Sequence, residues 1–264
     1  MKKMIVAVVC FAFAIGVVCG NSEIENYRKA AEQGDAVAQR KLGYRYGNGI
    51  GVKQDHAEAF KWYRKAAEQG DAKGQHNLGY CYENGLGVKQ NHAEAVKWYR
   101  KAAEQGWAYS QFNLGNCYYM GKGVKQDYTE AVKWIRKAAD NGDTTAQYAL
   151  AICYAEGHGV KQDVSEVVKW LRKAAEQGFV DAQFKLAQGY ATGELGLPTN
   201  YTESAKWLEL AAKQGHVEAQ YMLGCYYKYG YGVEKSAEQA DFWFRKVAEQ
   251  GYKLPEEALK NNKE

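Results

Sequence analysis

The decapeptide YRKAAEQGDA occurs twice in the chain without a change, at Tyr27–Ala36 and at Tyr63–Ala72. A third copy, at Tyr99–Ala108, differs only by Trp107, which takes the place of the aspartate. Copies that return every 36 residues are typical of repeat proteins, in which each repeat is one supersecondary structure. The residues between the copies therefore decide the architecture.

Six consecutive repeats follow when the glycine of AAEQG is taken as the last residue of each. Five contain 36 residues and one contains 37. Residues 21–34 resemble the second half of a repeat, and residues 252–264 resemble the first half, a partial capping helix with a tail. The six repeats are residues 35–70, 71–106, 107–142, 143–178, 179–215 and 216–251.

Each repeat contains two apolar-periodic stretches joined by a glycine loop. In the second repeat these are AKGQHNLGYCYENG, the loop GLGVKQ and the stretch NHAEAVKWYRKAAEQG. The period of the apolar residues in both stretches is helical. Each repeat is therefore predicted to be a helix, a turn and a second helix, in an all-α chain.

Start and stop signals support this prediction. The second helix begins with a capping box, in which the first side chain accepts from a free amide and the residue three positions later reaches back. Glycines after both helices supply the left-handed residue that ends a helix. The capping pairs are Asp55 with Glu58, Asn91 with Glu94, Asp127 with Glu130, Asp163 with Glu166, Asn200 with Glu203 and Ser236 with Gln239. The glycines that end the first helices are Gly49, Gly85, Gly121, Gly157, Gly193 and Gly230.

One tryptophan recurs in the second helix of every repeat, and one leucine recurs in every first helix. Full burial of such a ring contributes about 2–3 kcal/mol, so the recurrence favours a core role over a ligand site. The tryptophans are Trp62, Trp98, Trp134, Trp170, Trp207 and Trp243, and the leucines are Leu42, Leu78, Leu114, Leu150, Leu186 and Leu223.

The pattern A-x-x-Q-x-x-L-G-x-x-Y-x-x-G-x-G-V-x-x-D, followed by A-x-x-W-x-x-K-A-A-E-Q-G, resembles the Sel-like (Sel-one-like) repeat family, relatives of the tetratricopeptide repeats. The resemblance covers residues 35–251, with departures at Ala187 and in GELGLPTN, which has one extra residue. It implies a right-handed α-solenoid of helix-turn-helix repeats that holds other proteins. Some cysteine-rich secreted members are catalogued as β-lactamases, and others act as host-contact or envelope adaptors.

Stacked hairpins present their first helices along one concave side, which is a candidate groove for a protein or peptide partner. By analogy with tetratricopeptide units, the third, sixth, tenth and thirteenth residues of each repeat should face it. Aromatic residues there are typical of interaction hot spots. The sixth-position rings Phe112, Tyr148, Phe184 and Tyr221 could equally pack between helices, whereas we expect exposure of Tyr80, Tyr109 and Tyr119. The candidate partner-binding residues are Arg40, Tyr44, Lys73, His76, Tyr80, Tyr109, Phe112, Asn116, Tyr119, Tyr148, Phe184, Gln188 and Tyr221.

Residues 1–20 have the layout of a secretory signal peptide. Lys2 and Lys3 precede an apolar run from Met4 to Val18, and small residues follow. This run of about fifteen residues is shorter than the roughly twenty that a spanning helix needs. We therefore expect cleavage near Gly20, a secreted or periplasmic protein and no membrane span in the mature chain. A retained anchor and a lipid on Cys19 are the alternatives.

Charge and cysteine spacing exclude further classes. Loss of residues 1–20 lowers the formal net charge from +4 to +2, and basic and acidic residues alternate at helical spacing, so no nucleic-acid partner is expected. Cys81, Cys117 and Cys153 share one repeat position. Equivalent positions on stacked helices lie about 9–10 Å apart, beyond the roughly 7 Å that a disulfide allows between Cα atoms. Buried free thiols are therefore expected.

No residue pattern indicates a catalytic, metal or cofactor site. None of the five serines begins the S-x-x-K motif of penicilloyl-serine enzymes, and no two histidines stand at zinc-ligand spacing. The GLGVKQ loops follow a helix and lack the third glycine of a phosphate-binding turn. We therefore expect a monomeric, non-catalytic scaffold that binds a protein or peptide. The alternative is a cell-envelope protein of the cysteine-rich branch, either β-lactamase-like or able to bind cell-wall fragments.

Overall fold

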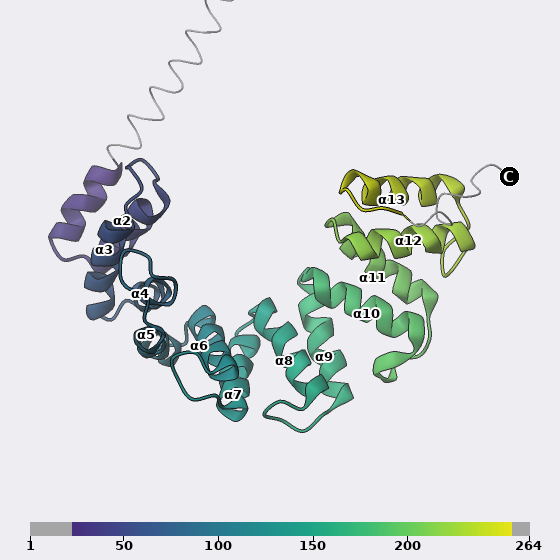
Figure 1. Cartoon of the computed structure of the whole chain (residues 1–264), viewed down its shortest axis with the longest axis horizontal. Coiled ribbons are helices and arrows are strands. Elements are labelled where there is room, and N and C mark those ends of the chain that lie inside the picture. The colour runs from purple at the N-terminus through teal and green to yellow at the C-terminus, as the bar shows by residue number, and fades with distance from the viewer. Residues whose placement is uncertain (1–22, 255–264) are drawn as a thin grey trace, which may run out of the picture. The chain divides into compact units, whose positions relative to one another are not determined.

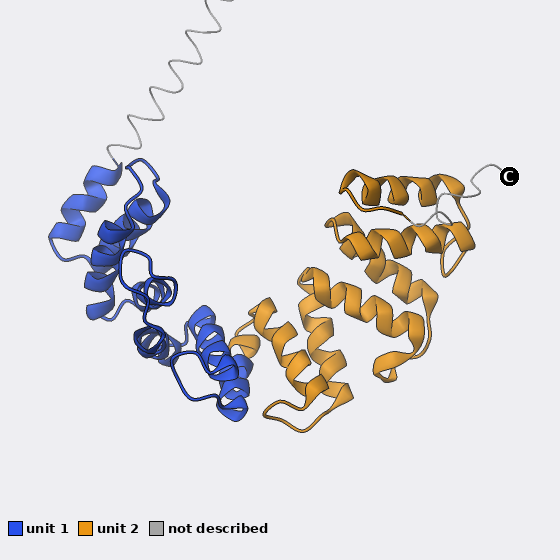
Figure 2. Cartoon of the chain, in the orientation of Figure 1, with its two compact units in different colours: residues 1–137 blue, residues 138–264 orange. Residues whose placement is uncertain are grey.

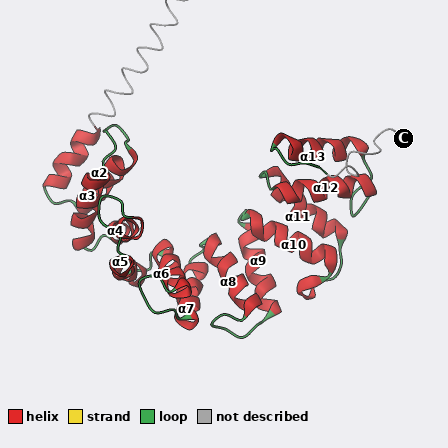
Figure 3. Ribbon diagram, in the orientation of Figure 1, coloured by secondary structure: helices red, strands yellow, loops and turns green. Residues whose placement is uncertain are grey.

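The computed structural model describes residues 23–254, and these residues form helices joined by short loops, with no strand among them (Figures 1 and 3). The expected signal peptide and residues 255–264 lie outside the described residues. After a helix over residues 23–32 the elements are α2 (Ala36–Asn48), α3 (His56–Glu68), α4 (Ala72–Asn84), α5 (His92–Glu104), α6 (Ala108–Met120), α7 (Tyr128–Asp140), α8 (Thr144–Glu156), α9 (Val164–Glu176), α10 (Val180–Thr192), the 3₁₀ turn η1 (Glu194–Gly196), α11 (Tyr201–Lys213), α12 (Val217–Tyr229) and α13 (Ala237–Glu249).

The chain divides into two compact units, Met1–Lys137 and Ala138–Glu264, with the boundary inside α7 (Figure 2). In the N-terminal unit, α2 pairs with α3 and α4 pairs with α5, while α3 contacts α4 and α5 contacts α6. The C-terminal unit repeats this order in the pairs α8–α9, α10–α11 and α12–α13. Within each unit the hairpins thus contact their neighbours along the chain, and the prediction of an all-α solenoid is confirmed.

The cap of each second helix is only half of the predicted capping box. Asp55 accepts hydrogen bonds from the amides of Ala57 and Glu58, as expected. The predicted hydrogen bond from the Asp55 amide back to the Glu58 side chain is wrong, because the Glu58 carboxylate pairs with Lys61 at 2.5 Å. The Asp55 amide instead donates to the Tyr46 carbonyl at the end of the first helix, at 2.9 Å. The cap therefore closes the hairpin as well as starting its second helix.

The same closure recurs in the other hairpins. The amides of Asn91, Asp127, Asp163, Asn200 and Ser236 donate to the carbonyls of Tyr82, Tyr118, Tyr154, Tyr190 and Tyr227, respectively. The glycines predicted to end the first helices all have left-handed backbone angles, with φ between 67° and 79°. These stop signals are confirmed.

The core contains the repeated leucines, each at most 1% exposed, but it differs from the predicted tryptophan ladder. Trp134, Trp170 and Trp243 are buried, whereas Trp62, Trp98 and Trp207 are half-buried. The residue directly after each tryptophan is the one that is always buried. These residues are Tyr63, Tyr99, Ile135, Leu171, Leu208 and Phe244.

The glycine that follows the repeated leucine makes room for that neighbour of the tryptophan. A Cβ atom added to Gly43 would lie 2.8 Å from the Tyr63 ring, and one added to Gly79 would lie 2.8 Å from the Tyr99 ring. Ala151 and Ala187 stand at the same position where the facing residue is a leucine instead of a ring. The pair Leu-Gly thus packs against a buried ring at Gly43, Gly79 and Gly224, and against Ile135 at Gly115.

A buried glutamine joins each hairpin to the one before it. Gln75 is 5% exposed, and its Nε2 donates to the Ala67 carbonyl of the preceding hairpin at 3.2 Å. Its Oε1 accepts from Gln105 Nε2 at 2.8 Å, so both ends of the buried amide are satisfied. The same two hydrogen bonds are made by Gln39, Gln147, Gln183 and Gln220. Sequence analysis assigned no role to this position.

Candidate partner-binding surface

Three exposed tyrosines mark the first helices of the N-terminal unit. Tyr44 on α2, Tyr80 on α4 and Tyr109 on α6 are 53%, 47% and 58% exposed. The exposure predicted for Tyr80 and Tyr109 is therefore confirmed. A surface that carries one uncovered aromatic ring on each successive first helix can accept a long, partly apolar guest.

Other candidate residues gather around Tyr109. Its ring centroid lies 5.5 Å from that of Trp107, which stands at the start of α6 without a side-chain capping bond. Lys73 Nζ lies 4.7 Å from the Trp107 ring centroid, and the His76 ring lies 6.3 Å from Tyr109. The change from aspartate to tryptophan in the third decapeptide thus replaces a helix cap by an aromatic patch.

His76 belongs to this patch but is not a free surface histidine. Its Nδ1 lies 2.9 Å from the hydroxyl oxygen of the buried Ser110, and its ring lies 5.6 Å from that of the buried Tyr99. Burial lowers the pKa of His76 to about 4, because desolvation disfavours the charged imidazolium. At neutral pH this candidate residue is therefore a neutral hydrogen-bonding group between α4 and α6.

Arg40 and Tyr44 border a basic hollow of about 440 Å³ near the start of the repeat array. Arg40 Nε lies 3.1 Å from Asp71 Oδ1, which is also the cap of α4. Lys41 Nζ lies 5.1 Å from the Tyr27 ring centroid on the same hollow. Part of its positive charge is thus already engaged within the protein.

The remaining candidates of the N-terminal unit differ in exposure. Asn116 is exposed and Phe112 is half-buried. The expectation that Tyr119 is exposed is wrong, since it is half-buried and its ring lies 5.0 Å from that of Tyr128 in an edge-on contact. The position of a residue within the repeat did not reveal this, because Tyr128 belongs to the variable start of α7.

In the C-terminal unit, the sixth-position rings pack between helices. Tyr148 contacts Phe179 at 5.0 Å between ring centroids, and Phe184 contacts His216 at 4.4 Å. Tyr221 lies half-buried, 6.0 Å from Phe244. Of the two alternatives left open for these rings, packing is the one seen here. Phe184, Gln188 and Tyr221 nevertheless also border an apolar hollow of about 420 Å³ on α10 and α12.

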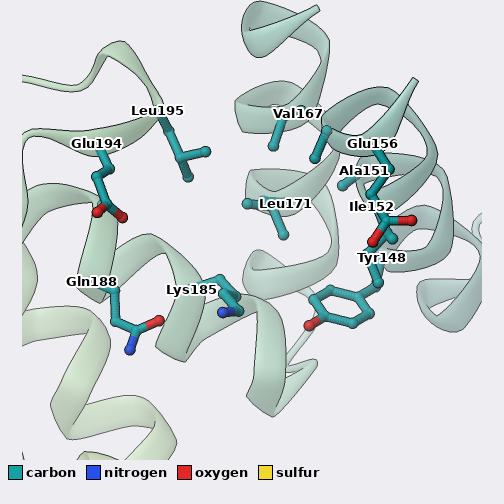
Figure 4. Close-up of a pocket in the computed structure, with 12 residues that line it drawn as sticks. Tyr148, Ala151, Ile152, Glu156, Val167, Leu171, Lys185, Gln188, Glu194 and Leu195 are labelled. Carbon is teal, nitrogen blue, oxygen red and sulfur yellow. The ribbon is translucent and has the colours of Figure 1, made fainter. Parts of the chain in front are cut away.

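A third hollow, of about 310 Å³, lies among α8, α9, α10 and η1 (Figure 4). Its walls are apolar, and polar side chains stand at its edge. The walls are formed by Ala151, Ile152, Val167, Leu171 and Leu195, and the edge is formed by Tyr148, Glu156, Lys185, Gln188 and Glu194. Two of the candidate residues, Tyr148 and Gln188, thus meet here.

Within the described residues there is no group of three or more His, Cys, Asp or Glu side chains placed to hold a metal ion. Cys81, Cys117 and Cys153 are free and buried, as predicted. Burial raises the pKa of the Cys81 and Cys117 thiols to about 12 and that of Cys153 to about 11, so these thiols are poor nucleophiles. No helix between residues 23 and 254 has the length and apolar character needed to cross a membrane.

Comparison with known proteins agrees with the geometry. The Sel1 repeat profile matches residues 24–35, 36–71, 72–107, 108–143, 144–179, 180–216 and 217–252. No match to a curated protein was found. The full-length matches begin one residue later than the repeats defined above from the glycine of AAEQG.

Three solved structures illustrate the similarity. The protein c5321, a protective antigen present in uropathogenic Escherichia coli strains and displaying an SLR fold, is 40% identical with a TM-score of 0.84 over 91% of this chain and 53% of its own. This chain therefore spans about half the length of that protein. A Sel1 repeat protein from Oxalobacter formigenes is 37% identical with a TM-score of 0.71, over 91% of this chain and 98% of its own. Immunity protein PA5088 from Pseudomonas aeruginosa, 19% identical with a TM-score of 0.51 over 82% and 88% of the two chains, shows the fold alone.

The fold defines a helical repeat protein whose first helices carry exposed aromatic rings. The chain belongs to the Sel1 repeat family. Sel1 repeat proteins are generally protein-interaction scaffolds, and their fold is typically non-catalytic.

Proposed function

We propose that this chain is a secreted or periplasmic scaffold that holds a segment of another protein against its first helices, as an adaptor or host-contact protein and without catalysis. The observation that carries the proposal is the row of exposed rings Tyr44, Tyr80 and Tyr109 on α2, α4 and α6. Exposed rings of this kind dominate the energetics of an interface when a partner covers them.

The chemistry around the row suits a protein guest. Tyrosine combines a wide apolar face with a hydroxyl group and loses little conformational entropy on binding. Lys73 and Asn116 are exposed on the same helices and can bond to main-chain carbonyls. Because the helices that carry these residues are fixed by buried leucines and glutamines, the surface is pre-organised, which lowers the cost of association.

Two observations support a place outside the cytoplasm. Residues 1–20 have the layout of a signal peptide, and the relative from uropathogenic Escherichia coli is described as a protective antigen. Both are consistent with a protein that meets its partner in the cell envelope or beyond it.

A binding experiment tests the proposal. Protein beginning at residue 21 is used to capture partners from envelope and host extracts, which mass spectrometry identifies. We expect Tyr80→Ala combined with Tyr109→Ala to weaken capture at least tenfold while circular dichroism stays unchanged, since truncation of a hot-spot ring costs about 2 kcal/mol or more. The matched control is Tyr229→Ala with Tyr231→Ala, two comparably exposed rings in and after α12, which should bind like the parent.

If the Tyr80 and Tyr109 variant captures partners as well as the parent does, the partner-binding surface does not lie at these two tyrosines. Hydrolysis of the β-lactam nitrocefin above a matched control, and its loss in the Tyr80 and Tyr109 variant, would replace the non-catalytic proposal by the enzymatic one.

A further inference from the structure

The hollow among α8, α9, α10 and η1 depends on a feature that only one repeat possesses. The repeat 179–215 has one residue more than the others, and the extra length falls in the loop after α10. Within this loop Leu195 has φ of 58°, and it is the sole non-glycine residue with positive φ between residues 23 and 254. Side chains with a Cβ disfavour this left-handed conformation, so contacts of Leu195 must hold it in place.

Those contacts are possible because α10 has a glycine where the first helices of other hairpins have a larger residue. Gly189 stands where α4, α6 and α8 have Cys81, Cys117 and Cys153, and where α12 has Tyr226. A Cβ atom on Gly189 would lie 3.3 Å from Leu195 Cδ1 and 3.1 Å from Leu197 Cδ1. The missing side chain thus admits the leucines of the longer loop. Leu195 then points toward Val167 and Leu171 across the hollow (Figure 4).

The edge of this hollow carries two carboxylates and one ammonium group. Glu156 and Glu194 stand on opposite sides of it, and Lys185 lies between them (Figure 4). Glu156 Oε2 lies 2.9 Å from His158 Nδ1. Among the described residues, neither Glu194 nor Lys185 forms an ion pair. The carboxylate of Glu194 therefore favours a cation at the edge, above walls that favour an apolar group.

We propose that this hollow is an anchor pocket for one bulky aliphatic or aromatic side chain of the bound protein segment, and that an arginine or lysine next to that side chain pairs with Glu194. The proposal rests on the proposed scaffold function and specifies the chemistry of its partner. The volume of about 310 Å³ is at the lower end of the range for binding pockets, which begins at about 300 Å³, and suits one side chain better than a whole ligand.

The test uses protein beginning at residue 21 and an array of twelve-residue peptides in a glycine and serine background. The peptides carry a central Phe, Leu, Trp or Ala, flanked by two arginines, two glutamates or two serines. We expect binding to require both the bulky central residue and the arginines, and to be at least tenfold weaker for Ala at the centre or glutamates at the flanks. Glu194→Lys should reverse the preference to glutamate flanks.

Two variants place the binding in the pocket. Ala155→Trp adds a ring at the hollow from an exposed position of α8 and should weaken binding at least tenfold. Its control, Ala237→Trp, adds the same ring at an exposed position of α13 and should leave binding unchanged. Leu195→Gly suits the left-handed backbone and removes one wall, so it should weaken binding without loss of fold.

Each outcome separates the pocket from the scaffold proposal. Three results would overturn the anchor pocket. These are peptide binding that is unchanged by Ala155→Trp and Leu195→Gly, equal binding of peptides with all three kinds of flanking residue, and no peptide binding at all. Capture that depends on Tyr80 and Tyr109 would survive any of these results. Conversely, peptide binding that is lost in Ala155→Trp while the Tyr80 and Tyr109 variant captures normally would support the pocket and reject the row of tyrosines.

Discussion

At the scale of single residues, the repeated decapeptide is explained by packing and caps. In its second copy, Tyr63 is 7% exposed and Ala66 is fully buried. Gln69 donates to Gln39 of the same hairpin at 2.7 Å, and Gly70 has φ of 90° after the end of α3. Asp71 then caps α4. The strict repetition is therefore a requirement of assembly, and function lies where copies differ, as at Trp107.

Gly43 and Gly47 on α2 allow a direct test of the packing argument. Gly43→Ala should lower the free energy of unfolding by about 1–2 kcal/mol, because overpacking against Tyr63 outweighs the gain in helix propensity. Gly47→Ala should raise it by about 0.5–1 kcal/mol, since its Cβ would meet only ordinary contacts at 3.6 Å or more. Urea unfolding measures both. Equal effects of the two substitutions would contradict the assigned role of Gly43.

His76 predicts a dependence of stability on pH. Its pKa is about 4 in the folded protein, against an ordinary value of 6.5. Between these values the unfolded chain binds more protons, so stability falls as the pH is lowered from about 7 to about 4, by on the order of 2–3 kcal/mol. His76→Asn lacks this titration. The stability difference between parent and variant should therefore shift in favour of the variant as the pH falls, and a constant difference would contradict the burial of a neutral ring.

The same residues show how far sequence reasoning reaches at this scale. Exposure of Tyr80 and Tyr109 followed from their repeat positions. The half-burial of Tyr119 did not, because it depends on Tyr128, a residue outside the repeat pattern. Gln75 is recognisable in the sequence as a recurring residue, but its hydrogen bonds are not. Closure of its own hairpin brings Gln105 to it, and stacking on the preceding hairpin brings Ala67.

At the scale of elements, the loops connect hairpins as well as helices. Gly87, in the loop between α4 and α5, lies against the first turn of α3 in the preceding hairpin. A Cβ atom there would lie 2.0 Å from the His56 carbonyl oxygen. Gly123 and Gly232 make the same close approach to His92 and Tyr201. Sequence analysis read these glycines as turn residues only, because the neighbouring hairpin that demands them is 30 or more residues away.

A matched pair of glycines separates backbone strain from this close approach. Gly70 has φ of 90° with nothing within 4 Å of an added Cβ, whereas Gly87 has φ of 70° and the contact with His56. Gly70→Ala should therefore cost only the left-handed penalty, about 1–2 kcal/mol. Gly87→Ala should cost about 3 kcal/mol or more, since overpacking adds to that penalty. Thermal unfolding measures the loss of stability in both variants. Similar losses would show that the loop at Gly87 does not pack against the preceding hairpin.

Helix positions were predictable because caps and glycines recur in every repeat, while the closure of the hairpins was not. The predicted return of Glu58 to the Asp55 amide is replaced by Tyr46, since the folded hairpin brings a main-chain acceptor closer than a side chain that can pair with Lys61. The loop of the fifth repeat was recognised as longer. The left-handed conformation of Leu195 and the hollow beside it could not be predicted from the sequence, because they arise from the absence of a side chain at Gly189.

At the scale of the whole molecule, a repeat array has no single centre that holds it together. Each hairpin is stabilised by its own core and by its neighbours, so opening starts most easily at an end. The four cysteines after residue 20 report on this behaviour. Cys81, Cys117 and Cys153 belong to interior hairpins and are at most 4% exposed, whereas Cys225 is half-buried on α12, in the last described hairpin.

We expect the thiol reagent DTNB to label Cys225 first in native protein beginning at residue 21. Its burial is the least complete of the four. Burial raises the pKa of all four thiols, so access of the reagent decides the order of labelling. Labelling of Cys81, Cys117 and Cys153 should be slower by orders of magnitude and should follow the opening of their hairpins, so subdenaturing urea accelerates it. Cys225→Ser should abolish the early phase without altering the slow one. Equally fast labelling of all four thiols would contradict a stack in which interior hairpins are protected by both neighbours.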